Sequence, residues 1–373
     1  MISNKFFLKN INYVPLLFIA FINFVFSYKY IHRVSEHALL ISIIYSCFFI
    51  FIPYLISLVN NKLYSYTVLL LLLLFTGISI FLLSKISVHV LNVDRWSVIT
   101  SFWDAFRNGQ FPYMARSHMN NLPGPFPIYF ILSFPFYCVG EIGYITIVSV
   151  LLFIGYIYKN YGKGKAILAL IVLLSSACIW WEVVARSTVF GNSVLLFIYI
   201  DCLYNAGLSK IRSLIVYGIA GGLILSTRGI LIIPLTLTFA FVFIRIGKWK
   251  GLFTCGIILV FSFICTLIPF ILLNPSLFMR YNSFNLQTVF VPSWVQLIFI
   301  VTAFLIGILL DTTYKVILYI GFILFASVIV YMVYDITRFD FESIYLGGIS
   351  DISYFSFSMP FFLFCLLRPS IQS

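Results

Sequence analysis

The stretch that decides the fold class is IILVFSFICTLIPFILL at residues 257–273, which carries no charged side chain. A second stretch, VLLLLLLF at residues 68–75, is apolar throughout. Strands of a membrane β-barrel alternate polar and apolar side chains, so these two stretches exclude a barrel. Continuous apolar segments cross a bilayer as helices, because a helix satisfies its own backbone hydrogen bonds.

The composition extends this conclusion to the whole chain. Of 373 residues, 62% are hydrophobic and 9% are charged. Soluble domains average about 45–50% hydrophobic and about 25% charged residues. Roughly 230 hydrophobic residues are enough for about eleven or twelve spans of about 20 residues each. We therefore predict an all-α polytopic membrane protein.

The basic character and the cysteines have ordinary explanations in such a protein. The net charge of +12 fits Lys and Arg retained in cytoplasmic loops, so no nucleic-acid partner is predicted. The first apolar run lacks a small-residue cleavage site and precedes Lys29 and Arg33, which is typical of a span rather than a signal peptide. Seven scattered cysteines without a CxxC pair predict neither disulfides nor a metal site: Cys47, Cys138, Cys178, Cys202, Cys255, Cys265 and Cys365.

Thirteen apolar stretches are candidates for crossing the membrane. The stretch 127–140 differs from the others, because it is short and contains Pro135, as expected of a helix on the membrane surface. The thirteen stretches lie at 13–29, 39–59, 66–86, 127–140, 143–158, 165–182, 186–204, 212–226, 229–246, 251–273, 295–310, 314–335 and 351–367.

The distribution of Lys and Arg decides whether 127–140 crosses. If it does not cross and the N-terminus is cytoplasmic, 13 of these residues lie inside and 10 outside; if it crosses, only 7 lie inside. Since cytoplasmic loops are enriched in Lys and Arg, we predict twelve spans, both termini in the cytoplasm, and 127–140 on the outer surface. Abundant Ile, Phe, Tyr, Lys and Asn is typical of an AT-rich genome, which favours a bacterial plasma membrane.

The outer face of this topology holds most of the chemistry. Nine of the eleven acidic residues and the long loops 87–142, 274–294 and 336–350 fall there, so we expect the protein to act on that side. We divide the chain into an N-terminal hairpin (1–65), a catalytic core (66–290) and C-terminal helices (291–373).

The loop 87–142 contains a recognisable series of residues. Asp94 follows a span, Gly109 and Pro112-Tyr113 break an amphipathic helix, and Pro123-Gly124-Pro125 leads into the short apolar stretch. This series resembles the integral-membrane glycosyltransferases of the GT-C fold, especially those that use polyprenyl-phosphate mannose. Further similarities occur at Phe190-Gly191-Asn192, at 218–223 leading to Ser226-Thr227-Arg228, and at 274–278.

The resemblance implies transfer of a sugar from a polyprenyl-phosphate donor to a hydroxyl of a glycan or glycolipid acceptor. Direct, inverting attack needs one carboxylate base, and the resemblance assigns that role to Asp94. The alternative is that Asp94 only caps a helix. The resemblance also assigns binding of the donor phosphate to Arg228, which could equally be an interfacial arginine. Arg186 and Arg280 are weaker candidates for the same role.

Other polar residues near the outer face are secondary candidates. Asp104, Tyr113, Glu182 and Asn192 could contact substrate, although a solvated helix face explains Asp104 and an ion pair between Glu182 and Arg186, four residues apart, explains Glu182. No carboxylate cluster demands a divalent metal, and neither His89 nor His118 has a neighbour at metal-ligand spacing.

Two other functions remain open at this stage. A polysaccharide polymerase or ligase usually has a large late outer loop with Arg and His, whereas the late loops here carry only Arg280 and Arg338. A flippase or transporter of lipid-linked sugars is expected to place charges at mid-membrane depth and to contain internal repeats. Most charges here lie at the ends of spans.

Overall fold

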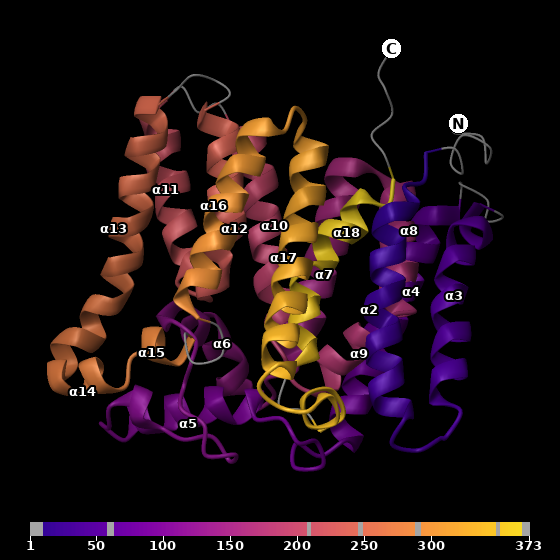
Figure 1. Cartoon of the computed structure of the whole chain (residues 1–373), viewed down its shortest axis with the longest axis horizontal. Coiled ribbons are helices and arrows are strands. Elements are labelled where there is room, and N and C mark those ends of the chain that lie inside the picture. The colour runs from indigo at the N-terminus through magenta and orange to yellow at the C-terminus, as the bar shows by residue number, and fades with distance from the viewer. Residues whose placement is uncertain are drawn as a thin grey trace.

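The protein is a bundle of helices. The computed structural model describes residues 10–57, 63–206, 210–244, 249–287, 292–347 and 351–367, and within these ranges the regular secondary structure is helical apart from one isolated β-bridge between Ile11 and Leu367. Figure 1 shows most of the helices standing side by side, with a layer of shorter helices at their lower end. The prediction of an all-α protein is confirmed.

Six helices of the described ranges are long and apolar enough to cross a membrane. A seventh candidate is the pair α8 (Lys163–Leu174) and α9 (Ala177–Val184), whose axes bend by 69° at the break between them. The six are α2 (Tyr13–Ile31), α3 (Ala38–Ser57), α4 (Tyr64–Lys85), α7 (Tyr144–Tyr161), α13 (Trp249–Leu273) and α17 (Thr313–Ile336).

The other predicted spans are also helical but shorter or interrupted. A helix of 17 residues, such as α10, rises about 26 Å, which is less than a hydrocarbon core of about 30 Å. The count of twelve spans is therefore not confirmed, although every one of the twelve predicted stretches contains a helix. These shorter elements are α10 (Val189–Asn205), α11 (Ile211–Leu225), η3 (Gly229–Leu231) with α12 (Ile232–Phe239) and η4 (Ala240–Ile244), α16 (Ser293–Leu309), and η6 (Ile352–Phe357) with α18 (Met359–Cys365).

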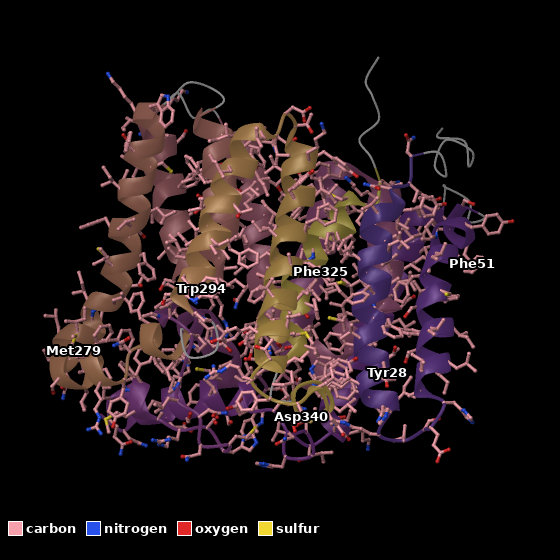
Figure 2. The ribbon with its side chains drawn as sticks, viewed as in Figure 1. Tyr28, Phe51, Met279, Trp294, Phe325 and Asp340 are labelled. Atoms are coloured by element: carbon pink, nitrogen blue, oxygen red, sulfur yellow. The ribbon has the colours of Figure 1, made fainter. Side chains whose placement is uncertain are left out.

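A layer of short elements covers the lower end of the bundle (Figure 1). The predicted surface stretch forms α6, a helix of 13 residues that ends at Gly140 with a φ of 85°. It packs on α5 through Phe102 and Phe130, whose rings stack 3.7 Å apart. The layer contains α5 (Arg95–Arg107), η2 (Pro112–Met114), α6 (Pro127–Val139), α14 (Pro275–Arg280), α15 (Ser283–Gln287) and η5 (Glu342–Leu346). Figure 2 shows Met279 of α14 and Asp340, just before η5, on this lower side.

The two ends of the described chain meet at the opposite side of the bundle from α5 (Figure 1). The Asn12 amide donates to the Leu366 carbonyl at 2.8 Å, and the Asn12 side chain donates to the Tyr314 hydroxyl at 2.8 Å. Helix α2 also packs against α18 and α9, and α3 against α8. The N-terminal hairpin is therefore part of the common core rather than a separate body.

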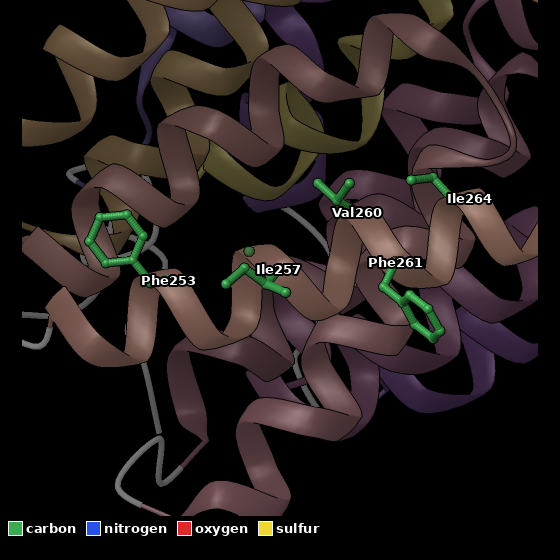
Figure 3. Close-up of a pocket in the computed structure, with 6 residues that line it drawn as sticks. Phe253, Ile257, Val260, Phe261 and Ile264 are labelled. Atoms are coloured by element: carbon green, nitrogen blue, oxygen red, sulfur yellow. The ribbon is translucent and has the colours of Figure 1, made fainter.

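Close packing of α11 on α13 depends on glycine. A Cβ at Gly222 would lie 2.4 Å from the Leu259 carbonyl oxygen, whereas a Cβ at Gly256, on the open face of α13, would meet nothing within 4 Å. Figure 3 shows that open face, where Phe253, Ile257 and their neighbours line a groove of about 580 Å³.

The Gly222→Ala variant is expected to lower the free energy of unfolding by about 1–3 kcal/mol, because two backbones must separate to admit the methyl group. Gly256→Ala is the matched control, since it adds the same group to open space and improves helix propensity. Thermal unfolding of both proteins in detergent checks this; equal melting temperatures for the two variants would contradict the packing described here.

Candidate functional site

Asp94 lies at the start of α5, where the segment between α4 and α7 folds back on itself. The Ser117 hydroxyl and the Asn121 side-chain amide both donate to its Oδ2, each at 2.7 Å. Asp94 occupies the N-cap position of α5, but its side chain makes no capping hydrogen bond. The alternative explanation that Asp94 serves as a helix cap is therefore wrong for its carboxylate, which is held by the loop instead.

The next residue, Arg95, joins three distant parts of the chain. Its guanidinium donates to the Ser187 hydroxyl, between α9 and α10, and to Asp351 and Ser353 at the start of η6. The Arg95 side chain is only 8% exposed, whereas that of Asp351 is 38% exposed. The pair thus fixes the start of α5, and with it Asp94, to the C-terminal part of the fold.

The ionisation of this pair follows from its surroundings. Burial alone would raise the pKa of Asp351, but the Arg95 charge and the hydrogen bonds from Ser353 hold it below its ordinary value of 3.8. Burial opposes the charge on Arg95, yet Asp351 and Glu182 together raise the pKa of Arg95 above its ordinary value. Both groups are therefore charged at neutral pH.

This ionisation predicts a specific pH dependence. Since the pKa of Asp351 is lower in the folded protein than in the unfolded chain, its contribution to stability is complete above the unfolded value and is lost as the pH falls through the folded value. We expect the difference in melting temperature between the natural protein and Asp351→Asn to stay constant from about pH 7 to about pH 5 and to shrink only below about pH 4. A difference that vanishes already at pH 5 would contradict the ion pair.

Arg228 reaches the same region from the end of α11. Its guanidinium carbon lies 6.0 Å from the centre of the Tyr354 ring, and the Arg95 guanidinium carbon lies 5.6 Å from the same ring. Arg228 also lies 5.0 Å from the centre of the Tyr129 ring. Two cations therefore share one aromatic side chain of η6, and one of them is adjacent in sequence to Asp94.

The Pro-Gly-Pro turn is docked beside Arg228. The Ile128 amide donates to the Ser226 carbonyl at 3.0 Å, which brings the start of α6 to the Ser226-Thr227-Arg228 segment. Tyr113, 1% exposed, donates its hydroxyl to the Pro125 carbonyl at 3.3 Å, and Ser283 donates to the same carbonyl at 2.7 Å. The structure thus brings together two motifs about 100 residues apart, with Tyr113 as a support of the turn.

Several buried polar atoms on the elements that meet here have no hydrogen-bond partner within the described residues. Glu182 is fully buried; its Oε2 accepts from the Phe190 amide at 3.0 Å, while its Oε1 has no partner. An unpartnered buried polar atom is costly, so each of these atoms needs a partner that the described residues do not supply. The others are Trp96 Nε1, Thr188 Oγ1, Asn192 Nδ2 and Arg228 Nε.

The expected ion pair between Glu182 and Arg186 is wrong. Arg186 instead pairs with Glu141, with 3.3 Å between Nε and Oε1, and donates to the carbonyls of Leu83, Ile86 and Val184. A break in the helix after Val184 and a positive φ of 52° at Arg186 turn its side chain toward the end of α4. The i, i+4 rule does not apply across a helix end. Arg186 holds the ends of helices together and is not brought to Arg228.

Two further predicted residues lie elsewhere in the layer of short elements. Arg280 is exposed at the end of α14, with its guanidinium 5.3 Å from the Tyr281 ring. Asp104 is exposed on α5 and accepts a hydrogen bond from the Tyr137 hydroxyl at 2.6 Å. Neither has a contact with the Arg95, Tyr354 and Arg228 group among the described residues.

The prediction missed the residues that organise the site: Arg95, Ser187, Asp351, Ser353 and Tyr354. One signal was present, because Arg95 directly follows Asp94 in the same outer loop. Asp351 gave no such signal, since it lies 256 residues away from Arg95 in the chain. Within the part of the chain that the structure describes, no group of three His, Cys, Asp or Glu side chains could hold a metal ion.

Neither a family model, a curated protein nor a solved structure matches this chain in the comparisons made.

Proposed function

We propose that this protein is a membrane glycosyltransferase that moves a sugar from a polyprenyl-phosphate donor to a hydroxyl of a glycan or glycolipid on the outer face of the membrane. The observation that carries the proposal is the juxtaposition at the start of α5. A single carboxylate, Asp94, is anchored by the loop and directly precedes Arg95, whose guanidinium shares the Tyr354 ring with that of Arg228.

The proposed mechanism uses Asp94 as the base. Both hydrogen bonds described for its side chain go to Oδ2, so Oδ1 is the oxygen that takes the proton from the acceptor hydroxyl. The hydroxyl oxygen attacks the anomeric carbon, and the bond from that carbon to the phosphate oxygen breaks with its electron pair on the phosphate. One carboxylate is sufficient for this inverting displacement.

Arg228 is the cation available to the leaving phosphate. Arg95 is already neutralised by Asp351, whereas Arg228 has no carboxylate partner in the described residues and its buried Nε has no hydrogen-bond partner. A fixed guanidinium stabilises the charge that develops on the phosphate. Glu182 Oε1 and Asn192 Nδ2 are the acceptor and the donor assigned to hydroxyl groups of the sugar.

The proposed topology has twelve crossings and both termini in the cytoplasm of a bacterial plasma membrane. This topology is supported by the enrichment of Lys and Arg in every second loop of the predicted order. It is also supported by the hydrogen bond between Asn12 and Leu366, since the start of α2 and the end of α18 lie at the end of the bundle opposite α5. An even number of crossings requires the two ends of the chain to lie on the same side.

The test is a transfer assay on protein in nanodiscs with labelled polyprenyl-phosphate sugars and glycan acceptors. We expect Arg228→Met to reduce transfer about a hundredfold, as does removal of one fixed donor to a developing anion. Arg338→Met is the matched control, because Arg338 is an exposed arginine of the same outer side that contacts only the Tyr334 ring among the described rings. Equal loss in both variants, or none in Arg228→Met, would contradict the assignment.

A further inference from the structure

A pocket lies at the other end of α5 from Asp94. It has a volume of about 460 Å³ and is lined by Arg107, Phe134, Tyr137 and Cys138. These side chains come from the last turn of α5 and the second half of α6. The pocket is thus part of the outer layer but separate from the Arg228 region.

Two polar groups of this pocket, Arg107 and Tyr137, form a hydrogen-bonded chain that ends at Asp104 beside the pocket. Arg107 Nη1 donates to the Tyr137 hydroxyl at 3.2 Å, and that hydroxyl donates to Asp104 Oδ1 at 2.6 Å. The Tyr137 hydroxyl therefore bridges the cation of Arg107 and the anion of Asp104. Most of the five N–H groups of Arg107 remain available to a ligand.

The wall beside the pocket is apolar and open. Ile131 is 55% exposed and Phe134 41%, and with the exposed Cys138 they follow the i, i+3, i+7 spacing of one face of α6. Phe134 also contacts Trp103, with ring centroids 4.5 Å apart. An apolar stripe that ends in a pair of opposite charges matches an amphiphile with a zwitterionic head.

We propose that this pocket binds the headgroup of an ethanolamine-type phospholipid, with the phosphate on Arg107, the ammonium on Asp104 and the acyl chains along Ile131 and Phe134 of α6. Arg suits a phosphate because it offers several parallel N–H donors. A purely anionic headgroup leaves Asp104 without a partner and is repelled by it. A choline headgroup has no N–H to donate to the carboxylate.

This binding has a structural consequence for the outer layer. α6 is a 13-residue apolar helix with Pro135 inside it, and the lipid would anchor its second half at the membrane surface. The proposal concerns the lipid environment of the protein and is independent of the glycosyltransferase activity proposed above.

Cys138 provides a direct readout because it lines the pocket and is exposed. Cys47 and Cys265, the other exposed cysteines of the described residues, are first replaced by Ser. The rate of Cys138 modification by a membrane-permeant maleimide is then measured in nanodiscs that contain phosphatidylethanolamine, phosphatidylglycerol or phosphatidylcholine. We expect phosphatidylethanolamine to slow modification about tenfold relative to the other two lipids, the equivalent of one charge-assisted contact.

Two variants separate the roles of the charges. Asp104→Asn is expected to abolish the preference for phosphatidylethanolamine over phosphatidylglycerol, and Arg107→Gln to remove the protection by phosphatidylethanolamine. Both residues are exposed, so the melting temperatures should stay unchanged. Arg338→Gln and Asp340→Asn, exposed charges of the same outer side, are the controls and should retain the preference.

Equal rates in all three lipids, or an unchanged preference in Asp104→Asn, would overturn the proposal. An added arm with polyprenyl phosphate distinguishes the lipid sources: protection by polyprenyl phosphate without protection by phosphatidylethanolamine would also overturn it. Protection by soluble phosphoethanolamine in phosphatidylcholine nanodiscs is expected, at higher concentration than the lipid, because the headgroup makes the polar contacts.

Discussion

Asp94→Asn is expected to reduce the rate of sugar transfer by about 10²–10⁴-fold, the usual contribution of a positioned general base. Asn is nearly the same size and can still accept a hydrogen bond from Ser117 or Asn121, so the loop should keep its conformation. Asn cannot take a proton from the acceptor hydroxyl. The loss should therefore appear in the transfer rate with little change in donor binding.

The control for this variant is Asp340→Asn, which removes an exposed carboxylate from the same lower side of the bundle (Figure 2). The measurement is single-turnover transfer in nanodiscs together with equilibrium binding of the donor. Full transfer by Asp94→Asn would remove Asp94 from the mechanism, and loss of donor binding in step with activity would assign it to substrate binding instead.

The second large effect is expected from Arg95. Arg95→Met removes a guanidinium that is only 8% exposed and leaves Asp351, which is 38% exposed, without its cation. Removal of one partner of a fully buried ion pair costs about 3–5 kcal/mol of unfolding free energy, so we expect a loss toward the lower end of that range. Asp351→Asn should be destabilising for the same reason, because the Arg95 guanidinium keeps only its Ser187 and Ser353 hydroxyl contacts as strong partners.

The double variant distinguishes the ion pair from general disruption. If the two charges interact, Arg95→Met with Asp351→Asn is less destabilising than the sum of the two single variants, because neither charge is left unpaired. Unfolding in detergent by denaturant measures all four proteins of the cycle. Additive effects would show that Arg95 and Asp351 contribute independently, which contradicts the link between α5 and η6.

The helical architecture could be predicted from the sequence because apolar runs are local. The length of the stretch 127–140 and its Pro135 predict a short helix at the membrane surface; α6 is a short helix packed on α5, and its place at the surface stays a prediction. The breaks inside runs were not predicted. The residues around Ser175 and Ser176 divide one apolar run into α8 and α9 at an angle of 69°, and hydropathy alone does not report such a bend.

Within the candidate site, the sequence indicates only residues that share one loop or one motif. Asp94 and Arg228 are candidates from the sequence, but the residues that link their segments are not, because Tyr354 and Asp351 come from the opposite end of the chain. Arg186 was misassigned for a physical reason: the helix ends before it, and its positive φ points the side chain away from Glu182. Contacts between side chains of distant segments depend on the tertiary fold, and the spacing of residues in the sequence does not reveal them.

The most direct test of the central claim is to follow the phosphate bond of the donor. The natural protein, reconstituted with a labelled polyprenyl-phosphate sugar and a glycan acceptor, is predicted to release one polyprenyl phosphate for each glycosidic bond formed, with inversion at the anomeric carbon. Donor that stays intact, or that moves across the bilayer without cleavage, would contradict the account and favour a transporter.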